Sequence, residues 1–252
     1  LGLVGSEMCI RDSEITDLDK VSAIAKAHGI PVVVDATFST PYLTQPLAHG
    51  CDIIVHSLTK WFGGHGSGIG GIVIDSGRFN WGAGKHPLYD EPDNSYHGLR
   101  WGHDLPEMLA PLAYILRMRT VPLRNLGACI SPDNAWMFLQ GIETLPLRME
   151  RHCENAMAVA KYLQGHDKVE WVRYAGLEDH PHHALAQKYM KGNASGIMTF
   201  GVKGGFEAGV KFYDALQLFK RLVNIGDAKS LACHPASTTH RQLSEEEQSA
   251  VG

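Results

Sequence analysis

The sequence lacks several features that would assign a chain to a class at once. No apolar run in its 252 residues approaches the roughly 20 residues needed to span a bilayer, so no membrane partner is expected. A formal net charge of -4 without a basic stripe argues against a nucleic-acid partner. The five cysteines are scattered and form no C-x-x-C pair, which argues against a disulfide framework and predicts a cytoplasmic location. The sequence also begins without a methionine or a signal-peptide pattern.

What the sequence does contain is a succession of apolar runs that end in polar side chains. Val32–Val34 is followed by Asp35, and Ile53–Val55 is followed by His56-Ser-Leu-Thr-Lys60. A glycine-rich loop and a third apolar run, Ile72–Ile74, come next. This alternation predicts an α/β fold with a mostly parallel sheet whose strands are buried on both faces. In such a sheet, polar groups at the strand ends lie where open α/β sheets bind ligands.

The polar residues at these strand ends suit one cofactor in particular. A lysine among hydroxyls and glycines can form a Schiff base with an aldehyde, which makes Lys60 a candidate for binding pyridoxal phosphate (PLP). Asp35 would keep the pyridine nitrogen protonated. Ser57 and Thr59 alternate along an expected extended backbone, so both hydroxyls would face one phosphate. Each residue also has a simpler interpretation: a solvated lysine, an aspartate in a turn, or hydroxyls that merely end a strand. The occurrence of the lysine, the aspartate and the hydroxyls together favours half of a PLP site.

Two other patterns have simpler explanations. Gly66, Gly68 and Gly71 match a dinucleotide fingerprint, but a strand rather than a helix is expected after them, so the match is rejected. The histidines of segment 180–183 fit a polar loop better than a metal site, and no metal is expected. Segment 234–240 is rich in polar groups and is predicted to lie near a ligand.

The second half of the chain predicts a change of architecture. Ser131-Pro132 is a helix start, and the helical pattern continues to about Gln164 with a break within 141–146. We therefore expect residues 14–145 to be part of a large PLP-binding domain. Residues 146–252 are expected to supply a connecting helix and a smaller, truncated α+β domain.

Three stretches together resemble the Cys/Met-metabolism family of PLP enzymes. They are VVVDATFSTPYLTQPLAHGCDIIVHSLTKWFGGHGSGIGG, QGIETLPLRMERHCENA and NIGDAKSLACHPASTTHRQLSEEEQ. The resemblance runs from about Glu14 to the last residue and implies the aspartate-aminotransferase-like fold, fold type I. EPDNSYHGL at 91–99, NIGDAKSL and HPASTTHRQL are most similar to the O-acetylhomoserine sulfhydrylase branch of the family. Cystathionine-processing members and methionine γ-lyases typically carry serine where this chain has Asn224.

The resemblance implies a role for each matching residue. Lys60 would bind PLP covalently and move protons, Asp35 would pair with the ring nitrogen, and Ser57 and Thr59 would help to hold the phosphate. Asn224 and Thr239 match positions that line the substrate carboxylate and the lysine. The implied reaction is a γ-replacement in methionine and cysteine biosynthesis, in which O-acetylhomoserine and sulfide give homocysteine and acetate. The implied full-length assembly is a homotetramer.

The chain also departs from the family pattern. Ala36 stands where the family usually has asparagine. The upstream phosphate loop, the ring-stacking tyrosine and the downstream arginine for the substrate carboxylate have no match, so the chain is expected to be a fragment. Residues 1–13 are expected to be foreign to the family and an artefact of the broken end. Two alternatives therefore stay open: another γ-family enzyme (a cystathionine γ-synthase, a cystathionine γ-lyase or a methionine γ-lyase), or a non-catalytic piece.

Overall fold

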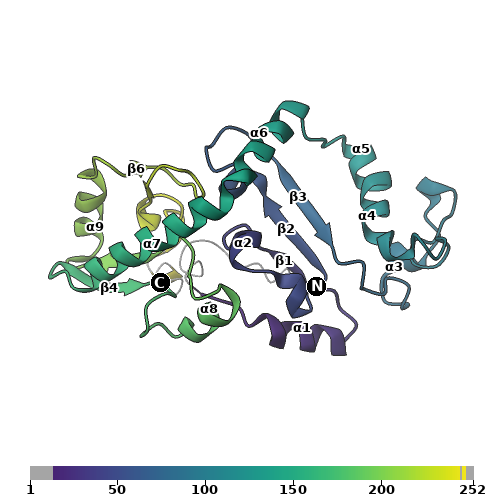
Figure 1. The fold of residues 1–252 in the computed structure, drawn as a ribbon, viewed down its shortest axis with the longest axis horizontal. Helices are drawn as coiled ribbons and strands as arrows, with labels where there is room; N and C mark the ends of the chain where they lie inside the picture. The colour runs from purple at the N-terminus through teal and green to yellow at the C-terminus, as the bar shows by residue number, and fades with distance from the viewer. Residues whose placement is uncertain (1–13, 245, 248–252) are drawn as a thin grey trace.

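The computed structural model describes residues 14–244 and 246–247. The expectation for residues 1–13 therefore lies outside the described residues. The first half of the chain is built on one small sheet (Figure 1). Its elements are α1 (Leu18–Ala27), β1 (Val33–Asp35), α2 (Thr40–Leu43), η2 (Pro46–His49), β2 (Ile53–Ser57), η3 (Leu58–Phe62) and β3 (Gly71–Asp75).

The sheet has the strand order β1-β2-β3, and its two pairings differ in direction. β1 and β2 are parallel, as expected, with Asp35 opposite Val55. β2 and β3 are antiparallel, with Ser57 opposite Gly71, so the described three-stranded sheet is mixed. The physical reason is the connection over 58–70, which is one helical turn and a glycine-rich loop. A parallel return would need a crossover, usually a helix.

The expected burial of the first strand on both faces is also wrong for the described part of the chain. Val33 is 55% exposed and Ile30, just before the strand, is 54% exposed. By contrast, Ile53 at the start of β2 is fully buried. β1 is one of the two edge strands of this described sheet, so only one of its sides has a strand neighbour.

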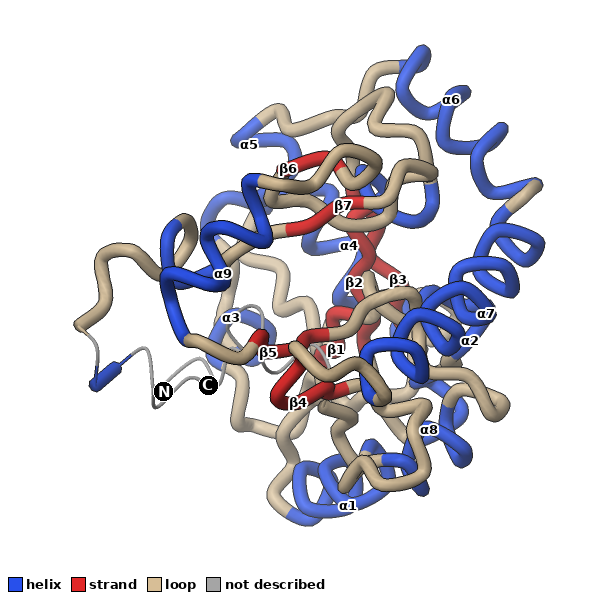
Figure 2. The backbone as a smooth tube through the Cα atoms, turned by 90° about the vertical axis from the view of Figure 1, so that its left-hand side faces the viewer, coloured by secondary structure: helices blue, strands red, loops and turns tan. Residues whose placement is uncertain are grey.

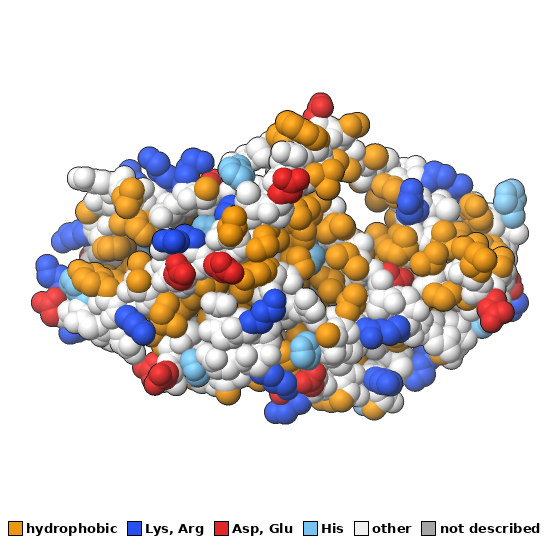
Figure 3. All heavy atoms as spheres, viewed as in Figure 1, with side chains coloured by type: hydrophobic (Ala, Val, Ile, Leu, Met, Phe, Trp, Pro, Cys, Tyr) orange, Lys and Arg blue, Asp and Glu red, His pale blue; other side chains and the backbone are white. Residues whose placement is uncertain are grey.

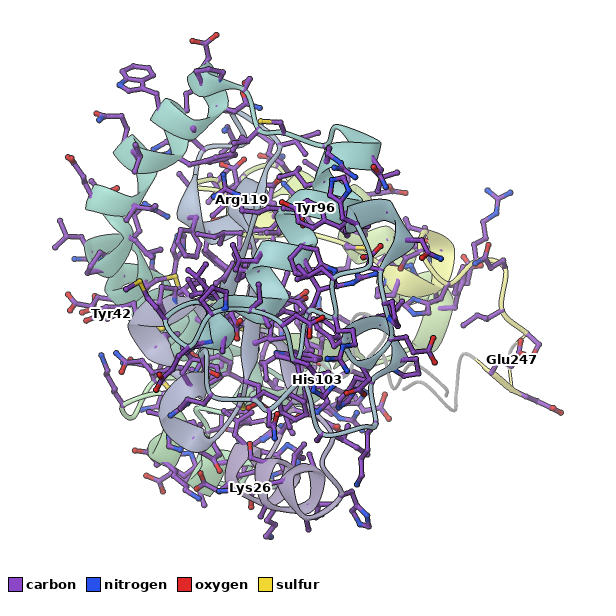
Figure 4. The ribbon with its side chains drawn as sticks, turned by 90° about the vertical axis from the view of Figure 1, so that its right-hand side faces the viewer. Lys26, Tyr42, Tyr96, His103, Arg119 and Glu247 are labelled. Carbon is purple, nitrogen blue, oxygen red and sulfur yellow. The ribbon has the colours of Figure 1, made fainter. Side chains whose placement is uncertain are left out.

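Residues 78–126 pack as a compact aromatic unit beside the sheet. Trp81 stacks on Tyr89 with ring centroids 4.4 Å apart and on Tyr114 at 5.3 Å. These rings share a buried cluster with Ile53 of β2, so the long excursion is anchored to the sheet by its own core. Figure 4 shows this unit from its outer side, with Tyr96, His103 and Arg119 labelled. Its elements are α3 (Pro87–Asp90), η4 (Asn94–Tyr96), η5 (Ala110–Leu112), α4 (Ala113–Met118), η6 (Arg119–Leu123) and α5 (Arg124–Leu126).

Two consecutive helices connect the halves of the molecule. α6 (Pro132–Glu143) begins as expected, because the Ser131 side chain accepts a hydrogen bond from the Asn134 amide. The helical path breaks at Thr144, and α7 (Leu145–Gln164) follows. The break coincides with the expected domain boundary, although the division into domains itself stays a prediction. In Figure 4, Tyr42 marks the α2 side of this connection, and its hydroxyl donates a hydrogen bond to Glu150 of α7.

The second half contains two further small sheets. β4 (Val169–Arg173) and β5 (Thr199–Val202) pair antiparallel, while β6 (Lys220–Arg221) and β7 (Leu231–Ala232) pair parallel. In Figure 2 the strands of the described sheets lie in the interior of the view, with α1, α7 and α9 around them and loops beside β6 and β7. The remaining elements are α8 (His183–Tyr189), α9 (Gly205–Asp214) and η7 (Pro235–Ser237).

The described surface carries many apolar side chains. Among the described residues, no helix combines the length and apolar character needed to cross a membrane. Figure 3 shows hydrophobic atoms gathered over the middle of the molecule, where Figure 1 places β2, β3 and α6. Trp136 and Leu139 of α6 are 63% and 62% exposed.

Candidate active site

The candidate site begins at the edge where β1 and β2 end. The two strands are parallel, so Asp35 and the residues after Ser57 emerge at the same edge of the sheet. The first residue after β2 opens a five-residue helical turn, η3, and Lys60 is its third residue. Lys60 departs from helical geometry, with φ -90° and ψ -124°, which bends the turn at the lysine. The structure thus brings the predicted carboxylate and the predicted lysine to neighbouring strand ends.

The turn changes the expected arrangement of the two hydroxyls. The backbone is extended only as far as Ser57, so the expectation that residues 57 and 59 alternate along one strand is wrong. The hydroxyl of Thr59 instead accepts a hydrogen bond from the Gly70 amide at 3.1 Å and lies 3.4 Å from the Gly70 carbonyl oxygen. The half-buried Ser57 hydroxyl has no hydrogen-bond partner among the described residues, which leaves it available to a ligand.

Thr37 joins the two strand ends, and the sequence patterns had not indicated it. Its hydroxyl accepts a hydrogen bond from the Ser57 amide at 2.8 Å, and its own amide donates to Oδ1 of Asp35 at 2.9 Å. Thr37 is only 5% exposed, whereas Asp35 is exposed, so the two hydrogen bonds are partly buried. The hydrogen bond to Asp35 closes an Asx turn, which is the signal that could have identified Thr37 two residues after an aspartate.

A segment far along the chain completes the described site. Nζ of Lys60 donates a hydrogen bond to the side-chain oxygen of Asn224. Two residues later, Gly226 adopts φ +77°, and a Cβ there would lie 2.4 Å from the Trp61 amide nitrogen. The Ala228 amide then donates to the Gly64 carbonyl at 2.9 Å. The 224–228 segment therefore packs backbone to backbone against the lysine turn.

The hydrogen bond described for Thr239 does not reach Lys60, unlike that of Asn224. The Thr239 hydroxyl lies 3.0 Å from Nδ1 of the adjacent His240, in the loop after η7. The hydrogen bond described for Thr239 is therefore local, and its role at a substrate carboxylate stays a prediction.

Two histidines pack beside the lysine turn, of which His56 is buried and His152 half-buried. His56 of β2 is 1% exposed, its Nδ1 has no partner among the described residues, and its ring packs against Phe62 at 5.0 Å. His152 of α7 packs its ring on Trp61 at 4.8 Å. Burial lowers the pKa of both imidazoles, and nearby Arg148 lowers that of His152 further. Both rings are therefore neutral near pH 7, and they surround the turn without adding positive charge.

The residues at this edge match the functional groups of PLP. A lysine amine suits an aldehyde, a carboxylate with one oxygen fixed by Thr37 suits a protonated ring nitrogen, and the unpartnered Ser57 hydroxyl suits a phosphate oxygen. Lys60 would hold the aldehyde carbon, Asp35 the ring and Ser57 the phosphate. The fold and the site together place this chain in the class of PLP-dependent enzymes.

Comparison with known proteins gives the family. The chain belongs to the family of Cys/Met metabolism PLP-dependent enzymes, which matches residues 11–252. It is 55% identical over 241 residues to an O-acetyl-L-homoserine sulfhydrylase of Leptospira meyeri, covering 94% of this chain and 54% of that relative. It is 45% identical over 251 residues to a homocysteine/cysteine synthase of Saccharomyces cerevisiae, covering 94% and 56%. The chain thus spans about half the length of the curated relatives it matches.

A solved structure confirms the predicted fold class. The crystal structure of a Campylobacter jejuni protein described as an O-acetylhomoserine (thiol)-lyase superposes with a TM-score of 0.85 at 42% sequence identity. The match covers 94% of this chain and 56% of that one. That crystal structure contains a lysine that carries a pyridoxyl phosphate group. The predicted fold type I architecture and PLP as the family's cofactor are both confirmed.

Proposed function

We propose that this chain is part of an enzyme that converts O-acetylhomoserine and sulfide into homocysteine and acetate by PLP-dependent γ-replacement. The observation that carries the proposal is the meeting of Lys60, Asp35 and Asn224 at one edge of the sheet. The relatives support the choice of reaction, because those at 42–55% identity include several named O-acetyl-L-homoserine sulfhydrylases. The reaction would belong to methionine and cysteine biosynthesis.

Each residue has a stated task in this proposal. PLP supplies an electron sink, which makes protons on substrate Cα and Cβ acidic and lets acetate leave Cγ. Nζ of Lys60 would hold the cofactor covalently until the substrate amine displaces it, and the freed lysine amine would then move the protons at Cα and Cβ. The Asp35 carboxylate keeps the proton on the ring nitrogen, and its orientation is set by the Thr37 amide.

The remaining predicted residues bind rather than react. The Ser57 hydroxyl donates to a phosphate oxygen, and Thr59 can join it if its hydroxyl turns away from the long 3.4 Å contact with the Gly70 carbonyl oxygen. Asn224 accepts from Lys60 through Oδ1, which leaves its amide NH₂ to donate to the substrate carboxylate. Thr239 would be the second group at that carboxylate.

The organisation of the whole protein is proposed on the same basis. Residues 14–145 would form part of the large PLP-binding domain, and residues 146–252 the connecting helix and part of the smaller domain. The full-length protein would be a homotetramer, a proposal supported by the exposed apolar side chains of α6, Trp136 and Leu139. A cytoplasmic location is supported by the four described cysteines, which are all unpaired. Neither nucleic acid nor membrane would be a partner.

The decisive experiment is to locate the cofactor chemically. The purified chain is mixed with PLP, reduced with borohydride and digested, and mass spectrometry identifies the modified peptide. Modification is expected at Lys60 and absent in Lys60→Ala, whereas Lys229→Ala changes an exposed lysine of the neighbouring 224–229 segment and keeps it. A colourless chain with Lys60 intact would instead support the non-catalytic reading. Assays with O-acetylhomoserine plus sulfide, and with methionine or cystathionine, then separate the proposed reaction from the alternatives.

A further inference from the structure

A half-buried cation with no anionic partner lies behind the lysine turn. The guanidinium of Arg148, in the first turn of α7, donates to the carbonyl oxygens of Trp61 at 2.7 Å and Phe62 at 3.2 Å. It also donates to the Gly141 carbonyl at 2.6 Å and to the Thr144 hydroxyl at 3.1 Å. Among the described residues, no carboxylate forms an ion pair with Arg148, so every hydrogen bond that holds it goes to a neutral oxygen.

Two of the three carbonyls that Arg148 binds belong to the turn that carries the lysine. Trp61 and Phe62 directly follow Lys60, and the carbonyls at the end of a helical turn have no partner within it. A cation is favourable at such an end because the carbonyl dipoles point toward it. The same helix junction approaches the turn closely at Gly141, where a Cβ would lie 2.5 Å from the Phe62 carbonyl oxygen.

Arg148 therefore connects two features that are far apart in the chain. One is the break between α6 and α7 at Thr144, and the other is the turn that carries Lys60. We propose that Arg148 is a positioning residue, whose guanidinium holds the lysine turn against this helix break and so fixes where the Lys60 amine points. The proposal deepens the proposed function and rests on Lys60 being the residue that binds PLP. The planar guanidinium presents five N–H donors in a rigid fork and here reaches four separate oxygens, whereas the lysine ammonium is a compact group with three donors.

The test compares Arg148→Lys and Arg148→Met with a matched change, Arg151→Lys. Arg151 lies one turn further along the same helix, and its side chain is 74% exposed. Its ion pair within the described part of the chain is with Glu154. Hydrogen exchange is followed at the Gly63 and Gly64 amides, which donate to the Leu58 and Lys60 carbonyls and so report on the turn. In parallel, the dissociation constant for PLP and the yield of borohydride-fixed Lys60 are measured below the unfolding temperature.

In both Arg148 variants we expect exchange at the two amides to accelerate about tenfold or more, and PLP to bind about tenfold more weakly, because the Trp61 and Phe62 carbonyls lose the guanidinium that holds them. Arg151→Lys should change neither quantity. The proposal is overturned if exchange rises equally in α1, or if PLP binding is unchanged while only the melting temperature falls. If the unmodified chain does not carry PLP at Lys60, the proposed function fails, and the exchange comparison still decides whether Arg148 holds the turn.

Discussion

Replacing Gly226 by alanine tests whether the 224–228 segment must touch the lysine turn. Gly226 has φ +77°, and an added Cβ would lie 2.4 Å from the Trp61 nitrogen and 2.5 Å from the Lys60 carbonyl carbon. Both atoms belong to the backbone, so no flexible side chain can move aside. The methyl group must displace either the segment or the turn that carries the lysine.

The chain provides a matched control for the backbone conformation alone. Gly98 has φ +76°, and a Cβ there would meet nothing within 4 Å. Gly98→Ala should therefore lower the unfolding free energy by about 1–2 kcal/mol, because alanine is strained in the left-handed conformation. Gly226→Ala should cost that amount plus about 1–3 kcal/mol for the clash, unless the segment moves away and relieves it.

Urea unfolding measures the free energy of unfolding of the two variants. PLP binding then shows whether the 224–228 segment has moved away from the lysine turn or has stayed in place. If the segment moves, Asn224 leaves Lys60 and the yield of borohydride-fixed cofactor falls, although stability drops no more than in Gly98→Ala. If the segment stays, the additional loss of stability appears. Equal loss of stability in both variants, together with unchanged cofactor binding, would refute the close packing described for Gly226.

Two further predictions concern the core and pH. Leu43→Ala should lower the unfolding free energy by about 2–5 kcal/mol, because Leu43 is 1% exposed and packs with Trp61, whereas Leu147→Ala, at a 69% exposed position, should change it by about 0.5 kcal/mol or less in urea titrations. Stability should fall as the pH drops below about 6.5, because burial and Arg148 lower the pKa of His152 and the unfolded chain then binds a proton that the folded chain does not. This histidine can add at most about 1.4 kcal/mol per pH unit, so His152→Phe should flatten the measured dependence, and an unchanged slope would count against its burial.

Parts of the fold and of the site could be predicted from local sequence, because they depend on interactions between residues close together in the chain. The cap at Ser131, the proline after it and the aspartate that ends an apolar run act through backbone groups only a few residues away. The same applies to Lys60, whose place after β2 follows from where the apolar run ends. Such features depend on neighbours along the chain, and a single sequence contains those neighbours.

Other parts of the site could not be read this way. The expected strand through Thr59 became a turn, and the Thr59 hydroxyl contacts the Gly70 backbone, while its role at a phosphate stays a prediction. Nothing within a few residues of Thr59 indicates this, because Gly70 reaches it only through the antiparallel return of β3. The resemblance to a family, rather than spacing, selected Asn224, which contacts Lys60 across 164 positions of sequence.

The sequence by itself therefore determined which chemical groups this protein has and the strand ends where they begin: an amine, a carboxylate and hydroxyls suited to PLP. Only the tertiary structure decided which of those groups are available and what holds them in place. Arg148 illustrates this difference. In the sequence it is one arginine in a helical pattern, and only the fold places it beside the Trp61 and Phe62 carbonyls, to which it donates hydrogen bonds. Unpaired buried groups arise from packing between distant segments, and a buried polar group without a partner is costly enough for the fold to supply one.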